Sequence, residues 1–170
     1  MSEAISSPGL AARAERSGDD PAYDLIELFF FAYRDFVSDP DRILAEYGFG
    51  RAHHRVLHFV VRRPGMTIAE LLDILKITKQ SLNRVLKELI DKGYIVQRTG
   101  HTDRRQRLLS ATDEGRELAL RMARLQSRRI ARALEGGPDE EGVRRFLMGM
   151  MDPGERAKVR NRLSGAKTTE

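Results

Sequence analysis

The 170-residue sequence contains no cysteine. This absence excludes disulfide bonds, thiolate metal ligands, cysteine nucleophiles and direct thiol redox sensing. It fits a reducing cytoplasm, where we expect the protein to act. The sequence also lacks any run of about 18 apolar residues, and its N-terminus lacks the basic and apolar regions of a signal peptide. We therefore expect no membrane partner.

Motifs for catalysis are missing as well. The sequence has no glycine-rich phosphate loop, no nucleophile elbow and no paired carboxylate constellation. His54 and His58 have the i, i+4 spacing that would let two rings share a metal ion, but no further ligands accompany them. We expect neither an enzyme nor a bound metal or other cofactor.

Positive charge is in excess, with 30 Lys and Arg residues against 25 Asp and Glu residues. This balance favours an anionic partner without proving one. The length suits either one domain with a substantial core or one domain plus a dimerisation extension. Residues 1–21 and 164–170 lack a repeating apolar face, so we expect a flexible N-terminal arm and a flexible tail.

Two amphipathic helices are predicted in the first third of the chain. From Tyr23 to about Tyr47 the apolar residues recur every three or four positions, as a helix with one buried face requires. A second helix is predicted from Arg51 to Val61. It stops before "RRPG", in which proline cannot continue a helix and glycine permits a turn.

Two short helices follow at close spacing. Thr67 and Glu70 fit a capping box, in which each side chain satisfies a free backbone donor at the helix start. Thr78 fits the N-cap of a further helix that ends before Gly93. Because both helices have one apolar face and a short connection, they predict a helix-turn-helix.

The second of these helices has a polar face opposite its apolar face. Arginine pairs well with guanine, and glutamine or asparagine pairs well with adenine. Lysines and hydroxyls near the helix N-terminus suit phosphate groups. The face therefore predicts major-groove contacts, although any surface helix turns polar residues outward. The candidate residues are Thr78, Lys79, Gln80, Ser81, Asn83, Arg84 and Lys87.

A basic loop lies between two segments of strand-like composition, "YIVQR" and "QRLLSA", which predict an antiparallel hairpin. A narrow basic loop can enter the minor groove, where the negative potential is strongest. Asp103 can hold a guanidinium in place by a charge-assisted hydrogen bond. The alternative is a solvated charged turn. The candidate residues are Arg98, His101, Asp103, Arg104, Arg105 and Arg107.

The C-terminal part predicts a long helix from Thr112 to about Leu134, followed by a break at "GGPD". A further helical region carries the apolar residues Phe146, Leu147 and Met150 and is interrupted by "DPG". This stripe and the first helix are more apolar than one small chain should leave exposed, so they are candidates for dimerisation. They could equally form the core of one chain.

The order of these elements resembles the MarR family of winged helix-turn-helix transcription regulators. The family's wing pattern is Asp, any residue, Arg, then a hydrophobic strand and Thr followed by Gly. The sequence departs from the family at Ala111, where Leu is usual, and in its interrupted C-terminal helices. "LIDKGYIVQR" at 89–98 also resembles the family's approach to the wing. The residues that match the wing pattern are Asp103, Arg105, Leu109, Thr112 and Gly115.

The resemblance implies a mostly α fold with a small antiparallel β-hairpin wing and with dimerisation helices at both ends. Arg105 would enter the minor groove with Asp103 as its orienting partner. Family members are homodimers, and two-fold symmetry implies an inverted-repeat site in double-stranded DNA with half-sites about 34 Å apart. The expected regions are 22–62 for N-terminal helices, 63–111 for DNA binding and 112–163 for C-terminal dimerisation helices.

Family members often lose DNA affinity when a small aromatic acid or phenol binds between the first, second and fifth helices. The nearby residues here are Phe30, Tyr33, Arg34, His54, His58 and Arg62, which could equally be plain core residues. We expect a dimeric, sequence-specific DNA-binding repressor whose affinity for DNA is tuned by a ligand. The alternatives are a winged-helix protein-interaction module and a non-specific architectural DNA binder.

Overall fold

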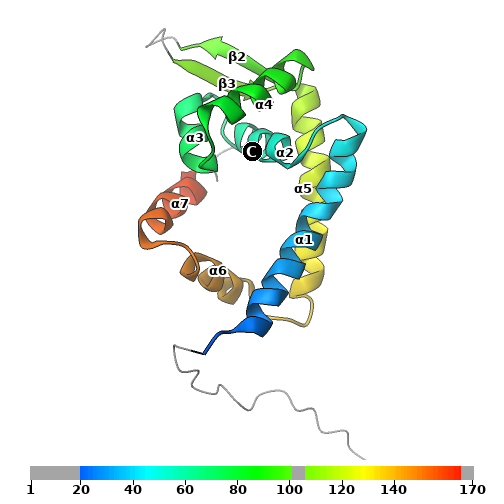
Figure 1. The fold of residues 1–170 in the computed structure, drawn as a ribbon, viewed down its shortest axis with the longest axis vertical. Helices are drawn as coiled ribbons and strands as arrows, with labels where there is room; N and C mark the ends of the chain where they lie inside the picture. The colour runs from blue at the N-terminus through cyan, green and yellow to red at the C-terminus, as the bar shows by residue number, and fades with distance from the viewer. Residues whose placement is uncertain (1–19, 101–105, 166–170) are drawn as a thin grey trace, which may run out of the picture. The chain divides into compact units, whose positions relative to one another are not determined.

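The structure is a computed structural model that describes residues 20–100 and 106–165. Within these ranges the chain forms seven α-helices and one three-stranded antiparallel sheet (Figure 1). No helix in the described ranges is long and apolar enough to cross a membrane. In chain order the elements are α1 Tyr23–Glu46, α2 Arg51–Arg62, β1 Met66–Thr67, α3 Ile68–Leu75, α4 Lys79–Asp91, β2 Ile95–Thr99, β3 Arg107–Ala111, α5 Asp113–Leu134, α6 Glu140–Gly149 and α7 Pro153–Gly165.

The chain divides between Arg34 and Asp35 into two units, so that the first half of α1 belongs to one unit and the remaining elements to the other. The first half of α1 is helical as predicted, but its apolar residues are exposed rather than buried. The side chain of Phe29 is 44% exposed and that of Phe30 is 65% exposed. The exposed residues are Tyr23, Leu25, Ile26, Leu28, Phe29, Phe30, Phe31 and Tyr33.

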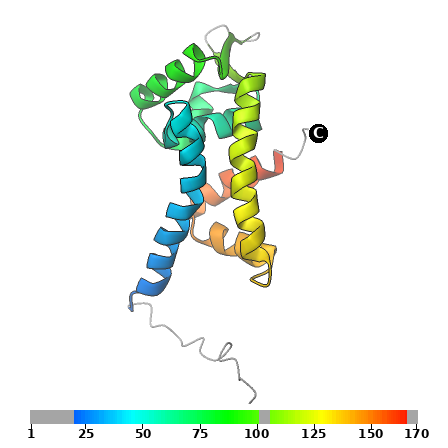
Figure 2. The same ribbon diagram turned by 90° about the vertical axis from the view of Figure 1, so that its right-hand side faces the viewer.

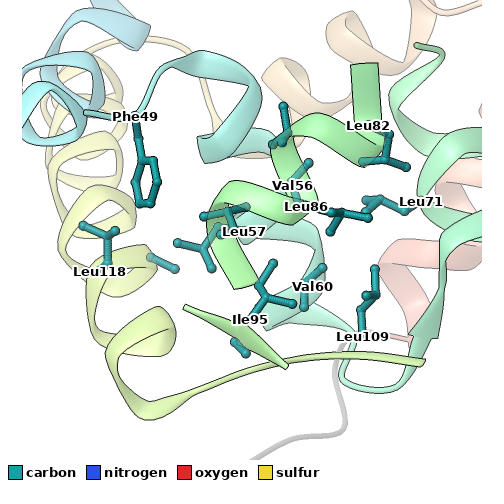
Figure 3. Close-up of a cluster of buried hydrophobic side chains, with 14 of the residues drawn as sticks. Phe49, Val56, Leu57, Val60, Leu71, Leu82, Leu86, Ile95, Leu109 and Leu118 are labelled. Carbon is teal, nitrogen blue, oxygen red and sulfur yellow. The ribbon is translucent and has the colours of Figure 1, made fainter. Parts of the chain in front are cut away.

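The second unit is built around α2, which packs against α3, α4, α5 and β3. Its buried residues Val56, Leu57 and Val60 lie at the centre of an apolar cluster (Figure 3). Leu82 and Leu86 come from α4 to the same cluster, which is a single continuous core. Removing these side chains from water is the main stabilising contribution to the unit.

Side-chain caps begin α3 and α4 at the residues that the sequence predicts. The Thr67 hydroxyl accepts from the Glu70 amide at 3.2 Å, and the Glu70 carboxylate accepts from the Thr67 amide at 2.7 Å. The Thr78 hydroxyl accepts from the amide of Ser81 at 3.1 Å. Between the helices, Lys76 adopts the left-handed conformation with φ of 52°, which reverses the chain direction at the end of α3. The predicted helix-turn-helix is confirmed.

The predicted hairpin is also confirmed, as strands β2 and β3. Their register pairs Ile95 with Ala111 and Thr99 with Arg107. The two-residue strand β1 adds to the other edge of β3, where Met66 pairs with Leu109, and gives the order β1-β3-β2. Strand β1 was not predicted from the sequence, because a strand of two residues is too short to show an alternating pattern.

The C-terminal helices break at the predicted positions. Helix α5 ends at Leu134, before "GGPD", and the Asp139 side chain caps α6 by accepting from the Gly142 amide at 2.7 Å. Helix α7 begins at Pro153, the first helical position, where a missing amide hydrogen costs nothing. Figure 2 shows α5 as one continuous helix, with α6 and α7 following it after turns.

Candidate nucleic-acid interface

Helix α4 has one buried and one exposed face. Leu82, Val85, Leu86 and Leu89 are buried in the core. The seven polar candidates from Thr78 to Lys87 are all exposed. The apolar stripe determines which face of α4 is buried, and the candidate side chains on the opposite face are therefore presented together to solvent. In the structure these residues therefore form one surface, as their spacing predicts.

The N-terminal end of α4 has its own hydrogen-bond arrangement. The Thr78 hydroxyl accepts from the Ser81 amide and donates to the Ser81 hydroxyl oxygen at 2.9 Å. The Thr78 hydroxyl is thus engaged in capping the helix. Lys79 and Gln80 follow on the exposed first turn, where the helix dipole adds positive potential that favours an anion.

The ammonium group of Lys87 forms an ion pair with Asp91 one turn further along α4. The hydrogen bond from Lys87 to Asp91 raises the pKa of Lys87 above its ordinary value. Both side chains are exposed, at 75% and 57%. Asp91 was not among the residues singled out from the sequence, although its i, i+4 spacing from Lys87 is the usual signal for such a pair. The candidate surface therefore includes the negative charge of Asp91 next to Lys87.

The hairpin adds two exposed arginines, Arg98 on β2 and Arg107 on β3. A guanidinium nitrogen of Arg107 donates to the Thr99 hydroxyl across the strand pair at 2.8 Å. The amide of Gly100 donates to the Gln106 carbonyl at 3.0 Å and extends the ladder by one step. Strand β2 also packs against α4, so both candidate surfaces belong to one packed body. The candidates His101, Asp103, Arg104 and Arg105 lie outside the described residues.

Comparison with known proteins identifies the family. Residues 47–106, from the first residue after α1 to the residue before β3, match the MarR family. The HTH-type transcriptional regulator PetP of Rhodobacter capsulatus is 48% identical over 130 residues, which cover 75% of this chain and 78% of PetP. The chain belongs to the MarR family of helix-turn-helix transcriptional regulators.

Solved structures with the same fold include other members of this family. The Streptococcus pneumoniae FabT structure, determined in complex with DNA, has a TM-score of 0.63 at 18% identity, covering 85% of this chain and 99% of FabT. A MarR protein from Peptoclostridium difficile has a TM-score of 0.63 at 19% identity, covering 93% of this chain and 97% of that protein. The winged helix-turn-helix fold is therefore established for this chain.

The Thr and Gly of the MarR wing pattern have a structural explanation here. The Thr112 hydroxyl donates to the Gly93 carbonyl at 2.7 Å and accepts from the Gly115 amide at 3.0 Å. A Cβ atom added at Gly115 would lie 2.1 Å from the Tyr94 carbonyl oxygen. Glycine is required because the start of α5 touches the backbone that leads into β2. These two residues attach the wing to α5 and serve the fold.

The ligand-pocket candidates fall on both units. Phe30 and Tyr33 are exposed on the first unit. On α2, the rings of His54 and His58 meet edge to face with centroids 6.4 Å apart. Arg62 lines a groove beside α6 and α7. No group of three or more histidine or carboxylate side chains in the described part of the chain could hold a metal ion.

Partial burial lowers the pKa of both histidines from the ordinary value of 6.5. For His54 the charge of the neighbouring His58 adds to this effect. For His58 the positive charges of Arg62 and Arg63 add to it. Both rings are thus disposed to remain neutral near pH 7. A neutral imidazole can donate or accept a hydrogen bond but contributes no charge for an anionic ligand.

Proposed function

We propose that the protein is a homodimeric, sequence-specific DNA-binding repressor that acts in the cytoplasm on an inverted-repeat operator. The observation that carries the proposal is the exposed polar face of α4, which lies directly opposite a fully apolar face buried in the core. A helix anchored in this way can enter a major groove without rearranging its own packing.

The side chains of the α4 face divide by chemistry. Asn83 and Arg84 suit adenine and guanine edges, which makes them the candidates for base recognition together with Gln80. Lys79 and Lys87 suit phosphates, which position the protein without reading sequence. The Thr78 hydroxyl caps α4 and is therefore not the group that we expect to bind a phosphate. At this end of the helix, the adjacent backbone amides and the Ser81 hydroxyl are the candidates for phosphate binding.

The wing supplies the second contact in this proposal. Arg98 and Arg107 flank the loop at the ends of the two strands and add positive charge to its base. Within the loop, His101, Arg104 and Arg105 would approach the minor groove, with Asp103 orienting Arg105. FabT, which has the same fold, was determined in complex with DNA, and this supports DNA binding by the fold.

The exposed apolar surfaces support dimerisation through both ends of the chain. A groove of about 680 Å³ beside α6 and α7 is lined by the apolar side chains Leu147, Met148, Met151, Val159 and Leu163. The charged side chains that line it are four arginines and one carboxylate, namely Arg62, Arg144, Arg145, Arg160 and Glu141. The first turns of α1 combine apolar residues with Asp24 and Glu27, so a second copy of this helix is complementary to the groove in both hydrophobicity and charge.

The oligomeric state tests this pairing directly. Changing Leu147, which is 45% exposed in the single chain, to Glu would place a charge in the groove. We expect the wild type to sediment as a dimer and the Leu147→Glu variant to sediment largely as a monomer. Leu120→Glu is the matched control, because Leu120 is equally exposed, at 48%, and does not line the groove. A monomeric wild type would contradict the dimer.

DNA recognition is tested by selecting duplexes from a random-sequence library with the wild-type protein. We expect an enriched inverted repeat. Arg84→Ala should cost about 1 to 3 kcal/mol on this duplex and relax its base preference, whereas Lys87→Ala should weaken all duplexes alike. Equal binding of all duplexes would indicate an architectural binder. No binding at any salt concentration would favour a protein-interaction module.

The proposed control by a ligand has a separate test. On α2, His54 and His58 provide imidazole groups and Arg62 provides a guanidinium, and these groups suit a small aromatic acid. We expect benzoate or phenol to weaken binding to the selected duplex, and a reporter gene behind that duplex to be repressed until the compound is added. Unchanged duplex binding with either probe at saturation would contradict ligand control by this class of compound.

A further inference from the structure

His53, at the start of α2, is bonded to two elements of the fold at once. Its Nδ1 atom lies 3.1 Å from the amide nitrogen of Gly50, the residue before α2. Its Nε2 atom lies 2.8 Å from a carboxylate oxygen of Glu88 in the middle of α4. The His53 side chain is only 12% exposed. One imidazole ring thus joins the α1–α2 connection to the helix with the candidate DNA-reading face.

The two bonds fix which nitrogen carries the hydrogen. A backbone amide can only donate, so Nδ1 must accept from Gly50 and cannot itself be protonated. Nε2 then carries the hydrogen and donates it to Glu88. The two nitrogens therefore have separate functions. Nδ1 satisfies an amide at the start of α2, and Nε2 holds α4.

The surroundings hold the ring in this orientation. The His53 ring stacks on Phe49 with centroids 4.7 Å apart, and Phe49 lies at the edge of the core (Figure 3). Phe49 has a second such contact, because the Lys92 ammonium at the end of α4 lies 4.5 Å from the centroid of its ring. The Lys92 ammonium also donates to the Tyr47 carbonyl at 2.7 Å. The connection between α1 and α2 is thus attached to α4 at two points, one helical turn apart.

We propose that His53 is a positioning residue for DNA recognition, acting through Glu88 to set the orientation of α4. This inference rests on the proposed DNA-binding function. The apolar stripe of α4 determines which face of the helix is buried, but the hydrophobic effect is not directional and opposes small rotations about that position only weakly. A directional hydrogen bond to a carboxylate on α4 supplies the missing restraint. A helix with a looser rotation would still bind phosphates but would discriminate less between bases.

Two substitutions separate the two functions of the ring. Glutamine can place an amide donor near the position of Nε2, whereas asparagine can place an acceptor only near the position of Nδ1. His53→Gln therefore retains a donor for Glu88, and His53→Asn retains an acceptor for the Gly50 amide. The readout is the ratio of affinities for the library-selected duplex and for a scrambled duplex. This ratio cancels the general effect of charge on binding.

We expect His53→Gln to keep the affinity ratio within about twofold of the wild type, and His53→Asn and Glu88→Ala each to lower it about tenfold, the usual effect of one lost hydrogen bond to a charged group. The double variant His53→Asn with Glu88→Ala should be no worse than either single variant. Equal ratios for the glutamine and asparagine variants, or additive losses, would overturn the proposal. Unfolding by urea, measured in parallel, identifies any variant that fails to fold.

A spectroscopic measurement tests the same geometry without DNA. In long-range ¹H–¹⁵N spectra of the full-length protein, we expect His53 to show the neutral tautomer with hydrogen on Nε2. The opposite tautomer would overturn the proposal even if DNA binding is found. Conversely, a wild type that selects no duplex contradicts the proposed function, and the tautomer result then tests the His53–Glu88 contact by itself.

Discussion

The Arg162 guanidinium on α7 donates to the carboxylate of Asp73 on α3, although the two residues are 89 positions apart. Lys76 and Lys158 approach the same carboxylate at 2.7 and 3.4 Å. Hydrogen bonds from Lys76 and Arg162 hold the pKa of Asp73 far below its ordinary value. The C-terminal helix is thus attached by ion pairs to the first helix of the helix-turn-helix.

Changing Asp73 to Asn should loosen α7. The neutral amide retains hydrogen-bonding capacity but loses the attraction to three cations. We expect faster amide hydrogen exchange in α7 at low ionic strength, with a difference from the wild type that shrinks as salt screens the ion pairs. Glu117→Gln, on α5, is the control for loss of one surface carboxylate. Identical exchange in α7 of the wild type and the Asp73→Asn variant would contradict this attachment.

Changing Gly115 to Ala should destabilise the fold. The new methyl group would lie 2.1 Å from the Tyr94 carbonyl oxygen, and that oxygen already accepts a hydrogen bond from the Thr112 amide. The two atoms nearest to the new methyl group, the carbonyl oxygen and carbon of Tyr94, belong to the backbone and cannot move aside as a side chain could. We therefore expect a loss of about 1 to 3 kcal/mol in the free energy of unfolding, measured with urea. Gly149→Ala is the matched control, since nothing lies within 4 Å of a Cβ atom there. A loss no larger than that of the control would refute the close approach.

Stability should fall as the pH drops from 7 towards 5.5. Burial lowers the pKa of His54 and His58 in the folded protein below the value of 6.5 that they have in the unfolded chain. In the pH range between the lowered pKa values and 6.5, the unfolded chain therefore binds more protons than the folded protein. The contribution of the two histidines to stability is therefore complete above pH 6.5 and decreases below it. Unfolding in urea at several pH values should show this slope, and the variant His54→Gln with His58→Gln should flatten it. If the double variant shows the same dependence of the free energy of unfolding on pH, the dependence comes from other groups and the prediction is wrong.

Changing Asp91 to Asn should strengthen DNA binding. Asp91 holds the ammonium group of Lys87 and adds a negative charge to the candidate surface. Without it we expect tighter binding to every duplex by a few fold, and a steeper dependence of affinity on salt, because Lys87 becomes available to a phosphate. Fluorescence anisotropy with selected and scrambled duplexes measures both effects. Weaker binding of the variant would show that the ion pair orders Lys87 for its contact.

The local features of the fold were predictable from sequence because their signals are local. The helix starts at Thr67, Thr78 and Thr112 each depend on a hydroxyl and an amide three residues later. The polar face of α4 was also predictable, because the spacing of polar and apolar residues along one helix is sufficient to define it. Strand β1 was missed because it exists only through its pairing with Leu109, 43 positions away by the register Met66 to Leu109.

The contacts that orient the candidate interface were not predictable in this way. His53 and Glu88 are 35 positions apart, and no spacing rule connects them. The apolar stripe of α1 was correctly predicted as helical, but periodicity indicates only that one face of the helix must be buried against another surface. Periodicity does not indicate whether that other surface belongs to the same chain or to a second one. In the single chain, residues such as Phe30 are exposed.

The most direct test of the account is the ratio of affinities for the library-selected duplex and a scrambled duplex, measured at two salt concentrations. Phosphate contacts weaken equally for both duplexes as salt rises, whereas base contacts from Asn83 and Arg84 depend little on salt. We predict that both affinities fall while a ratio of at least about a thousandfold persists. A ratio near one at both concentrations would contradict a base-reading α4.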